Sequence, residues 1–275
     1  MSDEKLVSVE REGGVAIVTL NRPDRLNALN FAIMTELRLA LTEVAEDATV
    51  GCVVLTGAGR GFCAGGDLKD GGAEKGALAV NRDQGSRTEQ SFDNLRRHMQ
   101  SSWLLHEMKK PAIAMVNGPV AGAGIGLAGA CDIRLASETA TFFPAFDRIG
   151  AGGDFGSSWF WTKILGTGRA RELFFLSPKL TAQEALAMGI YARVLPEAEL
   201  RAATMEIAHR LANGPRMGWR YMKANLNMAE DASFEAALDH EALNMGLSTT
   251  ATATIMKAEY KARKEAEAQA AAEAG

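Results

Sequence analysis

The chain has 275 residues and a formal net charge of −4, so it is long enough to bury a large core. It has no long basic run, which excludes the usual signature of nucleic-acid binding. The three cysteines are sparse and lack metal-ligand spacing, which indicates a reducing compartment and no metal site. The segment Met1–Lys5 lacks a signal-peptide pattern, and glycines and a proline interrupt the most apolar window, 112–130. We therefore expect a cytoplasmic protein with no nucleic-acid or membrane partner.

The first half of the chain alternates short apolar runs with a helical pattern. Residues 6–10 and 15–20 predict two strands joined by a Gly13-Gly14 turn. Asn30 is a suitable cap for a helix over 31–46, whose apolar residues recur at helical spacing. Further short apolar strands are expected at 52–55, 112–116 and 133–136. This alternation predicts an α/β fold with a mainly parallel sheet that is covered on both faces.

The later segments divide into an irregular region and a helical one. A mobile segment containing Gly71-Gly72 and the polar run 81–90 should lead into a helix from 91 to 108. From residue 181 the pattern is almost wholly helical, with candidate helices at 197–213, 215–227 and 233–247. We place the boundary near Pro196, which gives a core of residues 1–195 and a helical region of residues 196–275. The tail 254–274 is either a solvated helix with a frayed end or a helix docked on a neighbouring subunit.

Two glycine-rich turns about sixty residues apart each follow a predicted strand. The first turn is 57–66, and the second is 117–126. Glycine permits positive φ and a close approach to backbone N–H groups, and a helix N-terminus adds a partial positive charge. Brought together, the two turns would supply two donors for a developing oxyanion. Alternatively, each turn merely permits a tight passage from strand to helix.

Four stretches in order, 20–29, 62–68, 117–126 and Cys131-Asp132, resemble the enoyl-CoA hydratase/isomerase (crotonase) superfamily. The resemblance runs from about Val7 to about Asn227. It implies a crotonase-type ββα spiral core with a C-terminal helical region that serves oligomerisation and pocket closure. It also implies a homotrimer or dimer of trimers, and an acyl-CoA thioester substrate with no further cofactor.

The resemblance assigns roles to particular residues of this chain. The backbone N–H groups of Gly66 and Ala123 would hold the thioester oxygen as it becomes enolate-like. The turn after the second strand would bind coenzyme A; Arg25 would meet a phosphate there unless it is simply a solvated turn residue. The remaining substrate-binding positions are Ala28, Ala64, Asp67, Leu68 and Phe146. We interpret Asp67 itself mainly as the N-cap of a helix that it opens.

The chain departs from the best-known members at the catalytic acid and base. Hydratases of the family use two glutamates, and the matching positions here are Gly126 and Phe146, which move no proton. Asp154 occupies a position where some isomerases and a dehalogenase of the superfamily carry a catalytic aspartate. Its apolar neighbours should raise its pKa, which suits a proton shuttle. The other interpretation of Asp154 is an N-cap for a helix over 155–164.

A single base without a second acid fits a double-bond shift better than hydration. Our leading hypothesis is an enoyl-CoA isomerase in which Asp154 moves the proton and Gly66 and Ala123 hold the dienolate. One alternative is an enoyl-CoA hydratase that uses Asp154 with a water. Another is a dehalogenase or hydrolase with Asp154 as nucleophile. The last is a non-catalytic protein that binds CoA esters.

Overall fold

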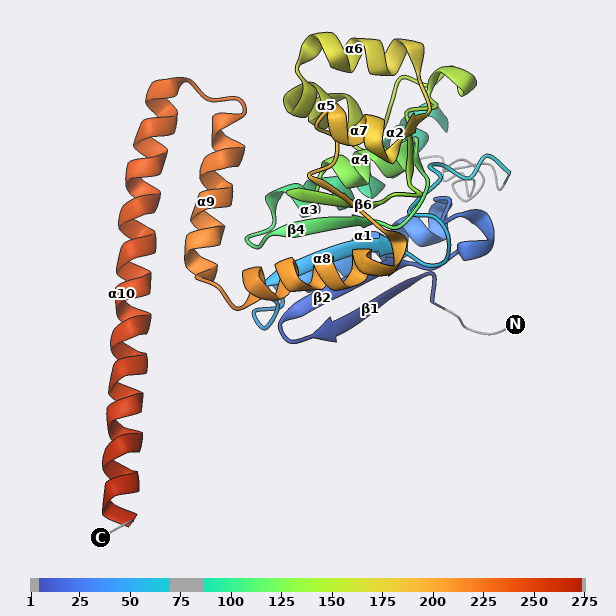
Figure 1. The fold of residues 1–275 in the computed structure, drawn as a ribbon. Helices are drawn as coiled ribbons and strands as arrows, with labels where there is room; N and C mark the ends of the chain where they lie inside the picture. Colours follow the sequence, from blue (N-terminus) through green and yellow to red (C-terminus); the bar gives the residue numbers. More distant parts are fainter. Residues whose placement is uncertain (1–4, 70–86, 274–275) are drawn as a thin grey trace. The chain divides into compact units, whose positions relative to one another are not determined.

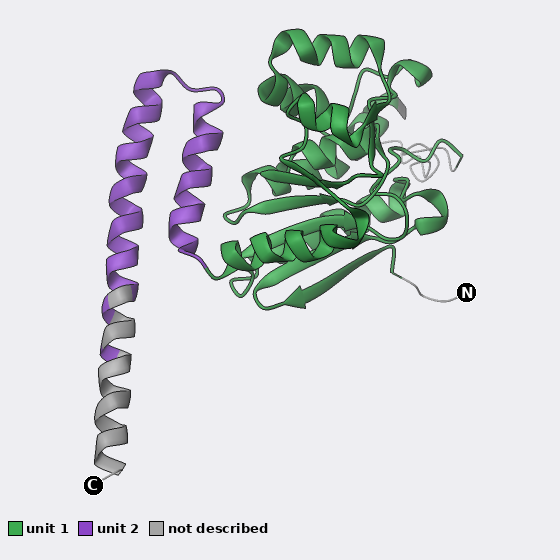
Figure 2. Cartoon of the chain, viewed as in Figure 1, with its two compact units in different colours: residues 1–213 green, residues 214–275 purple. Residues whose placement is uncertain are grey.

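The structure is a computed structural model that describes residues 5–69 and 87–273. It divides into two compact units, residues 1–213 and residues 214–275 (Figure 2). The boundary therefore lies at Asn213 rather than near Pro196. The reason is that the helix after Pro196 packs on the sheet of the first unit, as described below.

A six-stranded sheet forms the centre of the first unit (Figure 1). Its strands lie in the order β1-β2-β3-β4-β6-β9, and only the β1–β2 pair is antiparallel. The turn between β1 and β2 uses positive φ at Gly13 and Gly14, as predicted. The strand bounds are Val7–Glu12, Val15–Leu20, Cys52–Gly57, Ala112–Val116, Ile133–Ser137 and Arg193–Leu195. The predicted α/β class is confirmed.

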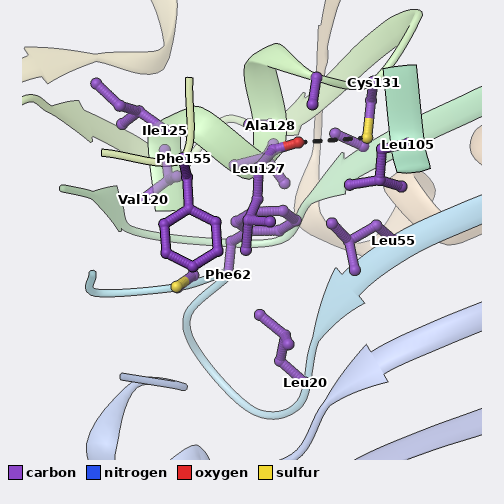
Figure 3. Packing of buried hydrophobic residues seen from close by; sticks show 14 of the residues in the cluster. Leu20, Leu55, Phe62, Leu105, Val120, Ile125, Leu127, Ala128, Cys131 and Phe155 are labelled. Atoms are coloured by element: carbon purple, nitrogen blue, oxygen red, sulfur yellow. Dashed lines mark hydrogen bonds between the residues drawn. The ribbon is translucent and has the colours of Figure 1, made fainter. Parts of the chain in front are cut away.

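Side chains of the central strands alternate between two apolar clusters, one on each face of the sheet. In β3, Val53 and Leu55 join the larger cluster, which Figure 3 shows from close by, while Cys52 and Val54 join the smaller one. Helix α8 (Glu197–Ala212) covers the smaller cluster with Leu200, Met205, Ala208 and Ala212. This packing makes α8 part of the first unit.

The larger apolar cluster includes residues from most of the other helices of the first unit. Helix α1 (Phe31–Glu46) begins as predicted, because the Asn30 side chain accepts a hydrogen bond from the amide of Ile33 at 3.1 Å. A smaller sheet consists of β5 (Val120–Ala121), β7 (Thr141–Phe143) and β8 (Leu180–Thr181). The remaining helices near it are α4 (Ala123–Gly129), α5 (Ser157–Leu165), α6 (Thr167–Leu176) and α7 (Ala182–Ala187). Short 3₁₀ helices occupy Pro23–Arg25 and Asp147–Ile149.

The helix predicted over 91–108 is two helices. These are α2 (Arg87–His98) and α3 (Gln100–Glu107), separated at Met99. The segment that we predicted to be mobile lies outside the described residues, except for 87–90, which begin α2.

The second unit is a pair of helices joined by a short turn. Helix α9 spans Arg216–Ala229, and α10 spans Phe234–Glu273, well beyond the predicted end at Leu247. The Asn244 side chain of α10 donates a hydrogen bond to Asn225 Oδ1 of α9 at 2.6 Å. Within the described ranges we find no helix with the length and apolar character that a bilayer crossing requires.

Candidate active site

The two glycine-rich turns meet in the first unit. Cys63 and Val120 form an isolated parallel bridge, in which the Ala121 amide donates to the Cys63 carbonyl at 2.9 Å. Gly65 has a φ of +87°, and a Cβ added there would lie 2.9 Å from the Ala121 carbonyl oxygen. Only glycine permits both this φ and this approach. The predicted convergence of the turns is therefore found.

The amides of Gly66 and Ala123 are both left without a protein acceptor among the described residues. Leu29 bonds to the neighbours of Gly66, namely the Gly65 carbonyl at 2.7 Å and the Asp67 amide at 3.0 Å, so the Gly66 N–H points away from Leu29. A Cβ on Gly66 would meet nothing within 4 Å, so open space adjoins it. Ala123 is the first residue of α4, where the N–H has no acceptor inside the helix.

Asp154 is a half-buried carboxylate whose surroundings offer it no partner. Its Oδ1 is fully buried and has no hydrogen bond to any described residue. Burial raises the pKa of Asp154 to about 6. The buried Cys63 thiol interacts with it, which places Asp154 beside the first glycine-rich turn. A carboxyl group with this pKa can both take and release a proton near neutral pH.

Asp154 does not act as a helix cap. Helix α5 begins at Ser157 rather than at Phe155, and its N-cap residue is Gly156, with a φ of +75° and no side-chain cap bond. The Asp154 backbone carbonyl accepts from the Ser157 amide at 2.9 Å, while the carboxylate takes no part. The capping interpretation was wrong because Phe155, with a φ of +49°, turns the chain before the helix starts.

Gly126, in the middle of α4, lies directly against the Asp154-Phe155 backbone. A Cβ on Gly126 would lie 2.7 Å from the Phe155 carbonyl oxygen, 2.8 Å from Phe155 Cβ and 3.1 Å from the Asp154 carbonyl oxygen. The Phe155 ring is itself held in the apolar cluster, among residues that include Val120 and Ile125 (Figure 3). The position that carries a glutamate in the hydratases therefore has no room for a side chain here.

We expect Gly126→Ala to destabilise the fold and to slow turnover, because the new methyl group must displace the backbone of Asp154 and Phe155. Forced overpacking of this kind costs about 1–3 kcal/mol. The matched control is Gly168→Ala in α6, where a Cβ meets nothing within 4 Å and a gain of about 0.4–1 kcal/mol is expected. Denaturant unfolding of the two variants checks this, and equal midpoints would contradict it.

Phe146 is the second position that the resemblance matches to a glutamate of the hydratases. It is buried and stacks on Phe174, with ring centroids 5.8 Å apart and an interplanar angle of 10°. The preceding Ala145 has a φ of +62°, and its amide donates to the Ser177 hydroxyl at 3.0 Å. Phe146 therefore offers an apolar wall and no proton-transferring group.

The turn between β2 and α1 is fixed by buried polar groups. The Arg22 guanidinium donates to the Asp67 carboxylate at 3.0 Å and to the Ala28 carbonyl at 2.7 Å. The buried Asn27 has a φ of +57° and donates to the carbonyls of Ala58 and Gly61 at 3.0 and 2.7 Å. These contacts tie the predicted coenzyme A turn to the first glycine-rich turn.

The described residues after Asp67 form a turn, and the residues that would continue the predicted helix lie outside the described ranges. Residues 67–69 form a turn, in which Asp67 Oδ1 accepts from the Lys69 amide at 3.0 Å while Oδ2 pairs with Arg22. The pair with Arg22 is largely buried, so Asp67 also fixes the backbone of the turn between β2 and α1.

The other predicted binding residues line the same turn region. Arg25 is exposed, and its guanidinium has no partner among the described residues, as expected of a side chain that meets a ligand or solvent. Ala28 is buried, Ala64 is half-buried with its amide bonded to the Leu26 carbonyl at 2.9 Å, and Leu68 is exposed.

Arg22 and Arg25 should respond to alanine substitution in opposite ways. Arg22→Ala leaves the Asp67 carboxylate, which is 5% exposed, without its main cation, and should cost about 3 kcal/mol of stability. Arg25→Ala should change stability by less than about 0.5 kcal/mol but weaken coenzyme A binding about tenfold, more so at low salt. Unfolding curves and calorimetric titration with coenzyme A measure both effects. Unchanged affinity in Arg25→Ala would leave Arg25 a solvated turn residue.

Sequence reasoning missed the polar side chains that hold the glycine-rich turns in place. Besides Asn27, Asn117 accepts from the Gly57 amide at 3.2 Å and donates to the Gly59 carbonyl at 2.9 Å. Asn117 precedes Gly118 in the second motif, and Asn27 follows Leu26 in the turn after β2. Asparagine in a turn is a signal for turn-stabilising side chains, although their partners lie more than thirty residues away.

The enoyl-CoA hydratase/isomerase family model matches residues 10–267. The chain belongs to the enoyl-CoA hydratase/isomerase family. It is 37% identical over 230 residues to 1,2-epoxyphenylacetyl-CoA isomerase of Escherichia coli K12, covering 84% of this chain and 85% of the relative.

Two further matches show the range of chemistries named within the family. The chain is 33% identical over 239 residues to 4-chlorobenzoyl coenzyme A dehalogenase-2 of Arthrobacter sp., covering 87% of this chain and 84% of the relative. The crystal structure of enoyl-CoA hydratase from Bacillus anthracis superposes with a TM-score of 0.78 at 28% identity, covering 88% of this chain and 90% of that chain. These names establish a crotonase-family acyl-CoA enzyme without selecting one of the three reactions.

Proposed function

We propose that this protein is an acyl-CoA isomerase that shifts a double bond, with Asp154 as its single proton-transferring group. The observation that carries the proposal is the buried, unpaired Asp154 Oδ1, in a site where Gly126 and Phe146 replace both glutamates of the hydratases. One carboxylate can take a proton and return it, whereas the family's hydration mechanism uses two. The relative named 1,2-epoxyphenylacetyl-CoA isomerase supports isomerase chemistry on an acyl-CoA, although its named substrate is an epoxide.

In the proposed reaction, Asp154 removes a proton from C2 of a 3-enoyl-CoA. The electron pair moves into a dienolate, whose thioester oxygen accepts hydrogen bonds from the Gly66 and Ala123 amides. Asp154 then returns the proton to C4, which leaves the double bond between C2 and C3. Two preorganised donors in a dry site can stabilise such an oxyanion by several kcal/mol. Arg25, Ala28, Ala64, Asp67, Leu68 and Phe146 are the proposed substrate-binding positions, and no further cofactor is required.

The test is an assay of the purified protein on crotonyl-CoA and on a 3-enoyl-CoA. Appearance of conjugated thioester absorbance from the 3-enoyl-CoA, without later loss, supports isomerisation. Loss of that absorbance from crotonyl-CoA would instead show hydration. Tight binding of both esters without turnover would favour a non-catalytic CoA-ester protein.

A second candidate is nucleophilic use of Asp154, which the similarity to a dehalogenase favours. Here the carboxylate attacks an electron-poor ring carbon, a halide leaves, and water hydrolyses the aryl ester. Chloride release from 4-chlorobenzoyl-CoA would establish this reaction. The buried Asp154 Oδ1 fits either role, since an ionised carboxylate without hydrogen-bond donors is also a better nucleophile.

We propose that the second unit serves assembly into a trimer or a dimer of trimers. Large apolar side chains along α9 and α10 are left uncovered by their own helix pair, among them Leu226, Phe234, Leu243 and Met245. Large exposed apolar side chains that gather on one pair of helices are typical of a subunit interface. Sedimentation as a stable monomer would contradict the proposal.

A further inference from the structure

A second buried polar atom without a partner lies three residues after Asp154. The Ser157 side chain is 0% exposed, and its hydroxyl has no hydrogen bond to any described residue. The hydroxyl can donate one hydrogen bond, while an ionised carboxylate can only accept. Asp154 Oδ1 and Ser157 Oγ are therefore chemically complementary, and each lacks a partner.

The turn that carries both residues is held rigidly. The Ser157 amide donates to the Asp154 carbonyl, which closes a four-residue turn. Phe155 and Gly156 have φ values of +49° and +75°, and a positive φ at a residue as bulky as phenylalanine persists only where the surroundings enforce it. The Phe155 backbone packs directly against the Cα atom of Gly126, and this contact holds the turn in place.

Ser157 Oγ lies on the same side of the turn as Phe174, whose ring and that of Phe146 form an apolar wall. A Cβ built on Gly153 would lie 3.4 Å from Ser157 Oγ and 3.8 Å from the ring of Phe174, which stacks on Phe146. Gly153 therefore lies next to the Ser157 hydroxyl and the Phe174 ring, and Asp154 follows it in the chain. The two side chains of Asp154 and Ser157 leave the chain at the two ends of one closed turn, and each side chain can change its rotamer about χ1.

We propose that Ser157 is a positioning residue, whose hydroxyl donates a hydrogen bond to the ionised Asp154 carboxylate and aims it at the carbon that loses the proton. The inference rests on the proposed function of Asp154. A hydrogen bond to the charged form favours that form, so Ser157 would keep Asp154 ionised at neutral pH against the effect of burial.

The other charged groups near Asp154 do not take this role. Burial is the cause of its raised pKa, and the described titratable group that interacts with it is the neutral Cys63 thiol, whose own pKa burial raises to about 12. Asp147 and Arg148 of the preceding 3₁₀ helix and Lys163 of α5 are not among the causes. Helix α4, which packs on this turn, contains only alanine, glycine, isoleucine and leucine.

The test compares Ser157→Ala with Ser101→Ala in α3, a matched control because Ser101 is equally buried and its hydroxyl also lacks a partner. Ser101→Ala should keep wild-type stability or gain slightly, since it removes an unsatisfied buried hydroxyl, whereas Ser157→Ala should have a slightly lower melting temperature at neutral pH, since it removes the proposed donor to a buried carboxylate. Only Ser157→Ala should lower kcat about tenfold, with KM unchanged, and shift the acid limb of the kcat/KM profile to higher pH. Ser157→Cys, with a similar size and a weak donor, should reproduce the loss even if the alanine variant folds poorly.

The same assay separates this inference from the proposed function. If Asp154→Asn is inactive while Ser157→Ala matches Ser101→Ala in kcat and in pH profile, the positioning role is overturned and the role of Asp154 stands. If Asp154→Asn retains full activity, both fail.

Discussion

Replacing Asp154 with asparagine should lower kcat by about 10²–10⁴-fold on a 3-enoyl-CoA while leaving the affinity for the CoA ester nearly unchanged. The reason is that asparagine matches the shape of the carboxylate but moves no proton, and general-base catalysis is worth about that factor. The group must be ionised to act as a base, so wild-type kcat/KM should fall as the pH drops below about 6, the pKa of Asp154. Steady-state rates from pH 5 to 8 measure both effects.

Stability should change in the opposite direction to activity. The folded pKa of Asp154 is about 6 against an ordinary value of 3.8, so its contribution to stability is complete below pH 4 and is lost as the pH rises through 6. At pH 7 the asparagine variant should therefore be more stable than wild type, by up to about 3 kcal/mol. The difference should shrink toward pH 4. Full turnover by Asp154→Asn, or a lower melting temperature at pH 7, would contradict this account.

Ala123→Pro should lower kcat by about 10²–10³-fold, the usual cost of losing one oxyanion donor. Ala123 is the first residue of α4, where proline is tolerated because its missing N–H has no helical acceptor. The preceding Gly122 has no Cβ to clash with the ring. The substitution therefore removes the proposed donor while keeping the helix, and binding of free coenzyme A should be spared.

The matched control is Ala182→Pro, which places proline at the first residue of α7 after the extended Thr181. Both positions are buried alanines at the start of a short helix, with 2% and 1% exposure. Any loss from ring crowding should appear equally in the melting temperatures of both variants, whereas only Ala123→Pro should lose turnover. Equal activities would remove Ala123 from the oxyanion site.

The strands and first helix could be predicted because their signals are local. The apolar run of β3 and the Asn30 cap depend on neighbouring residues, and both are confirmed. The convergence of the two glycine-rich turns was also predictable, because both follow parallel strands of one sheet.

The errors and omissions arose where a local preference competed with a distant partner. Aspartate favours helix caps, and the Asp67 side chain accepts from the Lys69 amide, but its ion pair with Arg22, 45 residues away in sequence, has no local signal. Asp154 also precedes a helix, but the chain turns at Phe155 with a positive φ, and α5 begins only at Ser157. The Asp154 carboxylate therefore does not cap α5. The interruption of the predicted helix at Met99 has no local sequence signal that we recognised. Sequence patterns thus pointed to candidate reactive residues but not to the long-range contacts that hold the turns around them.

The contact between Gly126 and Phe155 has a consequence for how this enzyme could diverge. A carboxylate on α4 and the present Asp154-Phe155 backbone would compete for the same volume, so the two ways of placing a base exclude each other sterically. A single substitution at Gly126 cannot convert one chemistry into the other. Any route, natural or engineered, must first rebuild residues 153–156, and during that step the enzyme would have neither base in place.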